Sequence, residues 1–198
     1  MIPRHLKIGV YILLMAVLIL SGYLWRLKRH AASIPRVAEA AHVAPPQAGP
    51  REQVTLYVAY DDPGMLMARG ASVPLSEGRQ QRADAVLRAL LNQYLAEDSP
   101  HQIAAGSEIR NVYLVDPGLA VVDMSSAMAD GHRSGILVEE LTIVSIVQTL
   151  STNVPGINRV KFLVDGKERE TLAGHADLSS VYDTSNVAQL AERLKAGQ

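Results

Sequence analysis

The sequence predicts an α+β domain, with helices packed on one face of a mixed β-sheet, behind an N-terminal transmembrane helix. Three observations predict it: residues 8–25 form an uncharged apolar run, residues 31–52 are rich in Ala and Pro, and strand-like and helix-like segments alternate over 53–182. Four parts are therefore expected, namely an anchor with basic flanks (1–30), a linker (31–52), an α+β domain (53–182) and an amphipathic C-terminal helix (183–198).

The run over 8–25 has the length and composition of a membrane span. It holds 15 apolar or aromatic side chains among 18 residues, and a helix of that length rises roughly 27 Å, close to the hydrocarbon core of about 30 Å. A cleaved signal peptide is the alternative, but its apolar core is usually about 7–15 residues long and ends in a small-x-small cleavage site. Here Trp25 and a basic cluster follow, which favours an uncleaved anchor that contacts the membrane through 8–25. The flanking bases are Arg4, Lys7, Arg26, Lys28 and Arg29.

The near-neutral charge of the chain is an average over two different parts. The whole chain has 19 Lys and Arg against 20 Asp and Glu, but the first 36 residues carry six bases and no acid, so the remainder has 13 bases, 20 acids and a net charge of −7. An acidic domain without a basic, aromatic-interleaved stripe is unlike a nucleic-acid-binding protein, so no nucleic-acid partner is expected. The absence of Cys excludes disulfides and lipidation on cysteine.

The charges leave the orientation of the anchor undecided. Two bases precede the span and three follow at once, which weakly favours a cytoplasmic C-terminal side, yet long domains translocate largely regardless of charge. The linker over 31–52 has seven Ala and four Pro and suits a semi-rigid spacer that reaches at most roughly 70–80 Å. It is expected to hold the domain off the bilayer.

The first half of the domain is predicted to hold two strands and a helix. Residues 54–60 are β-branched and aromatic with alternating character, which is typical of a strand, and the Asp-Asp-Pro-Gly sequence at 61–64 favours a turn. Residues 65–75 are expected to pair back as a weaker strand. Apolar residues recur at steps of three and four over 79–97, so a helix is expected until Asp-Ser-Pro at 98–100 ends it. Its apolar stripe is Ala83, Val86, Leu87, Leu90, Leu91, Tyr94 and Leu95.

The second half repeats this order, giving ββ-α-ββ-α-β. Strands are expected at 109–116 and 119–124 around an Asp-Pro-Gly turn, a helix at 136–150, and a further strand at 159–165. Residues 172–179 are expected to add a short edge strand. The helix is predicted to direct Leu137, Leu141, Val144 and Leu150 inward, with Ile143 and Val147 widening that face.

A terminal helix is predicted over 184–195, with Asp183 or Thr184 as its N-cap. Its apolar face either docks on the domain or serves a partner, and docking is the simpler interpretation. The domain has one Phe and no Trp, so its core is expected to be nearly all aliphatic. The apolar residues of the terminal helix are Val187, Leu190, Ala191 and Leu194.

Several segments together resemble the GerMN domain of bacterial sporulation and germination proteins. In order they are VTLYVAYDD, ADAVLRALLNQYLAED, AAGSEIRNVYLVDPGLAVVDMSS, IVSIVQTLSTNVPGINRVKFLVDGK and GHADLS, and the likeness covers about residues 52–182. The resemblance implies a non-enzymatic binding or assembly module on the extracytoplasmic side of a bacterial membrane, in a fold related to ring-building domains of secretion channels. The chain has one copy and a transmembrane anchor in place of two copies and a lipid-bearing Cys. The expected location is therefore the bacterial inner membrane, as a single-pass protein.

Two groups of acidic and hydroxyl side chains at strand ends could carry chemistry. Asp61 and Asp62 could offer oxygen ligands to a divalent cation, but no third ligand is indicated nearby, so a solvated turn is favoured. Asp123, Ser125 and Ser126 follow a strand and are expected to cap and fix the next loop.

His175, Asp177 and Ser179 have the side-chain types of a hydrolase triad. Residues two apart on a strand line up along one face rather than converge on one reacting atom, so GHADLS is interpreted as a structural turn. The remaining histidines are expected to be solvated and without a role, and no catalytic, metal-binding or cofactor-binding residue is assigned. These histidines are His5, His30, His42, His101 and His132.

Three hypotheses of function follow from these observations. The first is a membrane-tethered, extracytoplasmic module that binds a protein partner or itself. The second is an envelope sensor in which a sheet face or the Asp61 and Asp62 loop captures a small polar ligand or a glycan, which requires a concave pocket with convergent polar groups. The third and weakest is a hydrolase built on Ser179 or Ser125, for which no activating machinery is present in the sequence.

Overall fold

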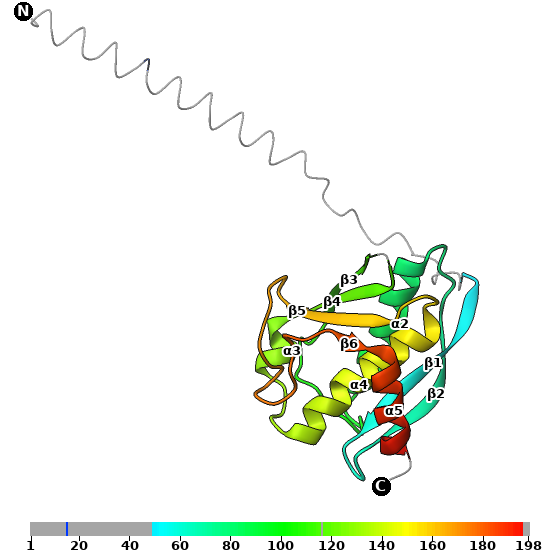
Figure 1. Cartoon of the computed structure of the whole chain (residues 1–198). Helices are drawn as coiled ribbons and strands as arrows, with labels where there is room; N and C mark the ends of the chain where they lie inside the picture. The colour runs from blue at the N-terminus through cyan, green and yellow to red at the C-terminus, as the bar shows by residue number, and fades with distance from the viewer. Residues whose placement is uncertain (1–14, 16–48, 116, 196–198) are drawn as a thin grey trace, which may run out of the picture. The chain divides into compact units, whose positions relative to one another are not determined.

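The computed structural model describes residue 15, residues 49–115 and residues 117–195, with side chains described as far as residue 192 (Figure 1). The chain divides into two units, 1–47 and 48–198, and the architecture below is that of the second. No described helix has the length and apolar character that a membrane crossing requires. The expected span at 8–25 lies outside the described residues except for Met15, which is helical.

The described strands form two sheets rather than the single mixed sheet that the sequence predicts. The first is an antiparallel hairpin, and the second has four strands in the order β3-β4-β5-β6, in which β4 and β5 are parallel and the other pairs antiparallel. The hairpin consists of β1 (Arg51–Tyr60) and β2 (Met65–Pro74). The second sheet consists of β3 (Ile109–Val115), β4 (Leu119–Met124), β5 (Arg159–Val164) and β6 (Tyr182–Asp183).

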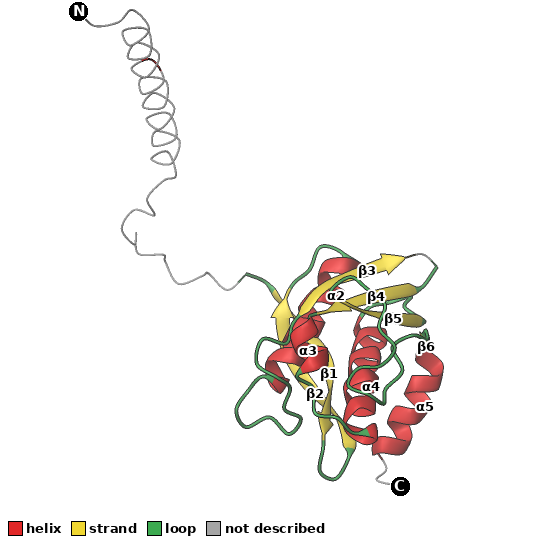
Figure 2. Cartoon of the chain, turned by 90° about the vertical axis from the view of Figure 1, so that its left-hand side faces the viewer, coloured by secondary structure: helices red, strands yellow, loops and turns green. Residues whose placement is uncertain are grey.

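The helices hold the two sheets together. α2 and α4 contact each other and the hairpin, and they cover one face of the four-stranded sheet (Figure 2). In α4, 11 of 18 residues are buried, because α2, α5 and the hairpin all pack against it. The described helices after residue 48 are α2 (Arg79–Tyr94), α3 (Ser126–Asp130), α4 (Ile136–Asn153) and α5 (Thr184–Lys195).

Side chains from the helices close the edge of β1 that faces away from β2. Alternate residues of a strand direct their N–H groups to the same edge, and three such donors of β1 are bonded to helix side chains. A further strand would need these same donors, so the hairpin cannot extend into the second sheet. The pairs are Thr55 N–H with Asn153 Oδ1 at 3.0 Å, Tyr57 N–H with Thr149 Oγ1 at 3.0 Å, and Ala59 N–H with the Tyr94 hydroxyl at 2.9 Å.

Most predicted elements are confirmed, with shifts at their ends. α2 ends at Tyr94 and leaves Leu95 exposed, and α4 runs on to Asn153, while Leu137 in its first turn is exposed rather than inward. The edge strand expected at 172–179 is wrong: only an isolated bridge lies there, and the edge strand is β6. The short helix α3 was not predicted. The core is aliphatic as expected, with Tyr94 and Phe162 as its fully buried aromatic side chains.

The terminal helix α5 packs on the domain. It contacts α4 and β2, and Val187 and Ala191 are buried. Asp183 caps it as predicted, since its Oδ1 accepts from the N–H groups of Ser185 at 2.8 Å and Asn186 at 3.4 Å. For the described side chains, this confirms the prediction that the apolar face of the helix packs on its own domain.

Replacing this cap is expected to weaken α5 by a modest and specific amount. Asp183→Ala removes the acceptor of two helix N–H groups and should lower the free energy of unfolding by about 1 kcal/mol, whereas Asp183→Asn keeps an equivalent cap. Urea denaturation of the two variants measures the difference. An equal loss in both would show that the charge of Asp183, and not its cap, stabilises the helix.

Candidate functional site

A buried polar cluster lies beneath the turn that joins β1 to β2. His101 Nδ1 is 2.6 Å from Asp61 Oδ1, and the Nε2 atoms of His101 and His132 lie 2.6 and 2.7 Å from the one hydroxyl of Thr142. Arg133 also pairs with Asp61. The expectation that His101 and His132 are solvated is wrong, because both rings are buried against α4.

Tertiary contacts that sequence patterns do not encode bring these histidines inside. The ring of His101 packs edge-on against Tyr94 with 4.8 Å between ring centroids, and the Asp61 N–H donates to the Pro100 carbonyl at 3.1 Å. The loop after α2 is thereby held to the end of β1. The cluster joins this loop, the hairpin turn and α4.

Asp61, His101 and Thr142 have the connectivity of a catalytic triad: carboxylate, imidazole and hydroxyl in line. A nucleophile must meet its substrate, but the Thr142 side chain has no exposed surface. Its hydroxyl is also shared with the second imidazole of His132. The arrangement is therefore structural, and both carboxylate oxygens of Asp61 are occupied, by His101 and Arg133.

The charges of this cluster are set by burial and by pairing. Burial lowers the pKa of His101, although the hydrogen bond to Asp61 opposes this, and burial also lowers the pKa of His132. Burial alone would raise the pKa of Asp61, but its hydrogen bonds to His101 and Arg133 outweigh that effect and lower it. At neutral pH the cluster therefore holds an ionised carboxylate and neutral imidazoles.

A second carboxylate, Glu139, fixes the GHADLS loop to the start of α4. Its side chain is fully buried, and its Oε2 accepts from the N–H groups of Ala173, His175 and Ala176, each at 2.9 Å. Its Oε1 accepts from the Gly135 N–H at 3.1 Å and pairs with His175 Nδ1 at 2.9 Å. Burial would raise the pKa of Glu139, but these hydrogen bonds, with His175 first, lower it to about 2.

Asp177 fixes the other end of the same loop. Its carboxylate accepts from the Ser179 N–H at 2.7 Å, the Ser179 hydroxyl at 2.6 Å and the Ser180 hydroxyl. The hydrogen bonds from Ser179 and Ser180 lower the pKa of Asp177 to about 2. The Tyr182 hydroxyl donates to the Asp177 carbonyl. The loop is thus held at both ends, as expected of a structural turn.

The structure does not assemble the triad suggested by His175, Asp177 and Ser179. The Ser179 hydroxyl donates to Asp177, while His175 bonds to Glu139 and lies 3.4 Å from the Ser134 hydroxyl. No bond joins His175 to Ser179 in the described part of the chain. Among the described residues, Ser179 therefore has no imidazole to activate it.

The residues at the end of β4 cap and fix loops, as predicted. Ser125 Oγ accepts from the Met128 N–H at 3.4 Å as the N-cap of α3, and from the Glu108 N–H at 3.1 Å. Asp123 Oδ1 accepts from the Gly166 N–H at 2.7 Å, and the Ser126 N–H donates to Asp165. Over residues 49–115 and 117–192, no group of three or more His, Asp or Glu side chains has the geometry to hold a metal ion.

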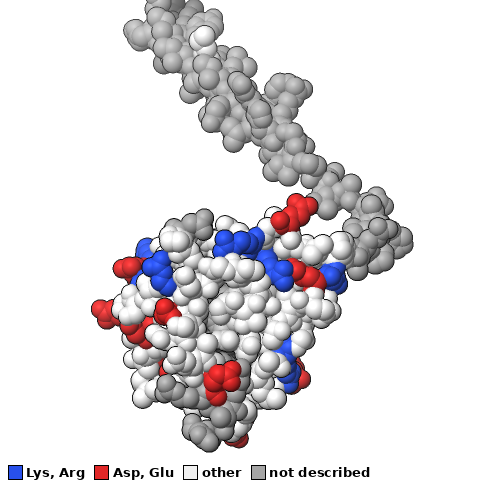
Figure 3. Space-filling view, turned by 45° about the vertical axis from the view of Figure 1, so that its right-hand side comes forward, with Lys and Arg blue, Asp and Glu red and all other residues white. Residues whose placement is uncertain are grey.

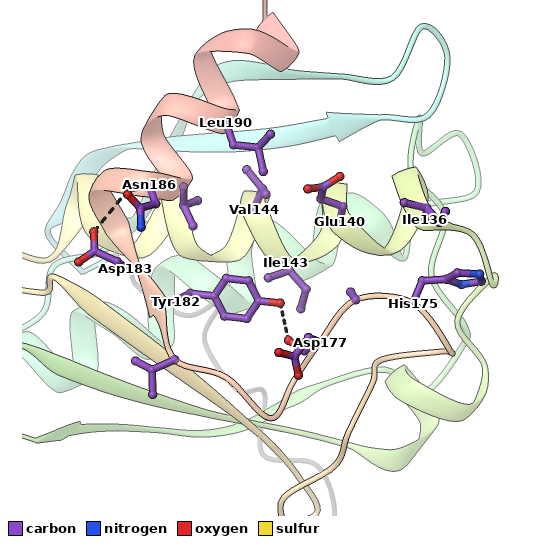
Figure 4. A pocket seen from close by; sticks show the side chains of 13 residues that line it. Ile136, Glu140, Ile143, Val144, His175, Asp177, Tyr182, Asp183, Asn186 and Leu190 are labelled. Carbon is purple, nitrogen blue, oxygen red and sulfur yellow. Dashed lines mark hydrogen bonds between the residues drawn. The ribbon is translucent and has the colours of Figure 1, made fainter.

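A cleft of about 420 Å³ opens between α4, α5 and the 175–183 segment (Figure 4). Tyr182 lies across it, and its ring packs edge-on against Phe162 with 5.6 Å between centroids. At its rim, Ile136 is 70% exposed and Val181 is 49% exposed. The other apolar side chains that line the cleft are Ile143, Val144, Val187 and Leu190, and the polar ones are Glu140, His175, Asp177, Asp183 and Asn186.

Charged side chains of both signs lie on one face of the domain. On the face shown in Figure 3, Lys and Arg are interspersed with Asp and Glu around a broad uncharged area, and no continuous basic stripe crosses it.

The family comparison agrees with this fold. The model of the Germane family, described as sporulation and spore germination, matches residues 55–170. The chain belongs to the Germane family. The resemblance to a GerMN-type domain is thereby confirmed. The match includes α4 with Glu139 and ends before the GHADLS loop, so one wall of the cleft lies inside the matched region and the other beyond it.

Solved structures are similar to this chain at low sequence identity, and the one whose TM-score exceeds 0.5 shows the same fold. The tandem GerMN domains of the sporulation protein GerM from Bacillus subtilis match with a TM-score of 0.51 and 19% identity over 69% of this chain and 48% of that one. An assumed lipoprotein from Clostridium perfringens matches with a TM-score of 0.47 and 18% identity over 74% of this chain and 96% of that one. The first GerMN domain of GerM from Bacillus subtilis matches with a TM-score of 0.45 and 17% identity over 65% of this chain and 94% of that one. No curated protein matches the sequence of this Germane chain.

Acid is expected to destabilise the domain progressively. The Glu139 pKa of about 2 lies below its ordinary 4.5, so its contribution is complete above pH 4.5 and is lost as the pH falls toward 2. Below about pH 6.5, the lowered pKa values of His101 and His132 also reduce stability as the pH falls. The reason is that these imidazoles take up protons more readily in the unfolded chain than in the folded domain. Urea midpoints measured at pH 7, 5 and 3 should fall in that order, and a midpoint that rises toward acid would contradict these shifts.

Proposed function

We propose that this Germane domain is a membrane-anchored, extracytoplasmic, non-enzymatic module that binds a protein partner through the cleft between α4 and α5. The observation that carries the proposal is the apolar rim of the cleft, where Ile136 and Val181 are exposed beside a hollow with apolar walls. Exposed apolar side chains gathered at a concavity are typical of binding surfaces.

The cleft is fixed in shape before any partner arrives. Glu139 holds one end of the 173–180 segment, Asp177 holds the other, and Tyr182 is fixed by its hydroxyl and by Phe162. A preformed site loses less conformational entropy on binding than a mobile one, which favours affinity. The rigidity therefore supports docking at this position.

A binding role fits the side chains better than catalysis does. The triad-like group at Thr142 is buried, and Ser179 is bonded to Asp177 rather than to a base. The sensor alternative that relies on Asp61 loses its ligand group, because that carboxylate is already paired with His101 and Arg133.

Membrane anchoring is supported by the sequence. The uncharged run over 8–25 is long enough to span a bilayer, and basic clusters flank it. The GerMN resemblance supports an extracytoplasmic position for the domain. We propose a single-pass protein of the bacterial inner membrane with the linker and domain outside.

Cysteine accessibility tests this orientation against a clean background, since the chain has no Cys. Glu77→Cys, an exposed position of the domain, should react with a membrane-impermeant thiol reagent in cells whose outer layers are permeable to it. Ile2→Cys should react only after the inner membrane is opened. The reverse pattern would place the domain in the cytoplasm and overturn the localisation.

Substitution at the rim tests the docking role. Val181→Asp puts a charge on the cleft rim, and Leu95→Asp puts one on an exposed apolar residue outside the cleft. A partner that co-purifies with the full chain from solubilised membranes should be lost with Val181→Asp and kept with Leu95→Asp. Co-purification of the same proteins with the wild-type chain and with both variants would refute the proposed docking at the cleft.

A further inference from the structure

Three carboxylates line the cleft. Glu140, Asp177 and Asp183 line it, and no Lys or Arg is among the described residues that do so. The remaining ionisable neighbours are His175, which is paired with Glu139, and the Tyr182 hydroxyl. At neutral pH the cleft therefore presents negative charge beside apolar walls.

Glu140 differs from the two aspartates because no described residue pairs with its carboxylate. Asp177 is bonded to Ser179 and Ser180, and Asp183 caps α5. Glu140 has no hydrogen bond or ion pair with any described residue, although it is only partly exposed. It lies on α4 one turn from both Ile136 and Val144, so it stands among the apolar lining (Figure 4).

An occupant that covers Glu140 must offer it a cation. Burying an unpaired carboxylate is costly, whereas a Lys or Arg that bonds to it forms a charge-assisted hydrogen bond in a site shielded from water. The same occupant must also supply apolar surface to meet Ile143 and Leu190. An acidic or purely polar segment satisfies neither requirement.

We propose that the partner docks through a basic amphipathic segment, which places an apolar side chain between α4 and α5 and a Lys or Arg against Glu140. This inference rests on the proposed function and adds the chemistry of the partner. The cleft volume of about 420 Å³ accommodates a few side chains of such a segment. Two flanking helices form the walls of a groove, a geometry that other domains use to bind amphipathic segments.

Synthetic peptides test the charge preference directly. The full chain in nanodiscs of uncharged lipid is titrated with a labelled 12-residue peptide of Leu, Lys and Gly, and with matched peptides in which Glu replaces Lys or Ser replaces Leu, and the signal from empty nanodiscs is subtracted. Only the Leu/Lys peptide should bind. Glu140→Gln should weaken its binding about tenfold, and Glu140→Lys should transfer the preference to the Leu/Glu peptide.

Glu77→Gln is the matched control, because Glu77 is an exposed acid outside the cleft. It should change the affinity less than twofold. Equal effects of Glu77→Gln and Glu140→Gln would overturn the proposal, as would a wild-type preference for the Leu/Glu peptide or no peptide binding at all. If Val181→Asp still releases the cellular partner in those cases, the docking function stands and only the inferred chemistry of the partner fails.

Discussion

Replacing Glu139 by Gln is expected to lower the free energy of unfolding by about 3 kcal/mol, the largest effect of any single substitution considered for this domain. The buried carboxylate accepts from four backbone N–H groups and from the partly exposed His175. Gln offers one oxygen and one NH₂ group, so part of these donors would face another donor. Urea denaturation at pH 7 measures the loss.

Glu140→Gln is the control for this prediction. Glu140 is the next residue on the same helix, has the same chemistry, and makes no hydrogen bond to a described residue. Its substitution should change stability by no more than about 0.5 kcal/mol. The difference in unfolding free energy between Glu139→Gln and the wild type should also shrink below pH 4.5, because Glu139 becomes protonated in the unfolded chain there. Equal stability of the two variants would show that Glu139 does not hold the loop.

Replacing Thr142 by Val is expected to cost about 2 kcal/mol. The change keeps the shape of the side chain and removes the one hydroxyl that lies within 2.7 Å of the Nε2 atoms of His101 and His132. Both imidazoles remain buried, so the Nε2 that accepts the Thr142 hydroxyl proton would be left without a donor. The free energy of unfolding again measures the loss.

Thr152→Val on the exposed side of α4 controls for the loss of a hydroxyl and for the helix propensity of Val. It should cost less than about 0.5 kcal/mol. If both substitutions have the same small effect, the histidine cluster is not a stabilising network. His101→Gln provides a second test, because its cost should be smaller in a Thr142→Val background than in the wild type.

Periodicity predicts most of the elements because their buried faces are formed by local spacing. The stripe on α2 from Ala83 to Tyr94 is buried as predicted, and α5 covers the predicted range with Asp183 as its cap. The division into two sheets was not predictable in the same way. It depends on Thr149 and Asn153 reaching across to the backbone of β1, which is a contact between segments over 90 residues apart.

The spacing of the polar residues on α4 predicts tertiary hydrogen bonds, which the spacing of the apolar residues alone does not reveal. Glu139, Thr142, Thr149 and Asn153 recur at helical spacing on a largely apolar helix, and all four are buried. A buried polar side chain needs a partner, so such a stripe predicts tertiary hydrogen bonds. The identity of the partners could not be predicted, because His101, His175 and the strand β1 reach α4 only in the folded domain.

Glu139 links the stability of the domain to the shape of the cleft. Glu139 holds the backbone of His175 and Ala176, and both residues line the cleft that Glu140 faces from the adjacent position on α4. The family match covers this helix but not the loop that it holds. The proposed binding through the cleft therefore depends on a contact between the matched region and the segment beyond it.

Site-specific photo-crosslinking in living cells tests the docking role of the cleft most directly. A photoreactive residue is placed at Val181 on the cleft rim, or at Tyr113, an exposed position on β3 outside the cleft. The account predicts an adduct with a second protein at position 181 but not at 113, its loss with Glu140→Lys, and a crosslinked peptide that contains Lys or Arg beside apolar residues. An adduct formed equally at both positions, or only uncrosslinked chain at position 181 under all growth conditions, would contradict it.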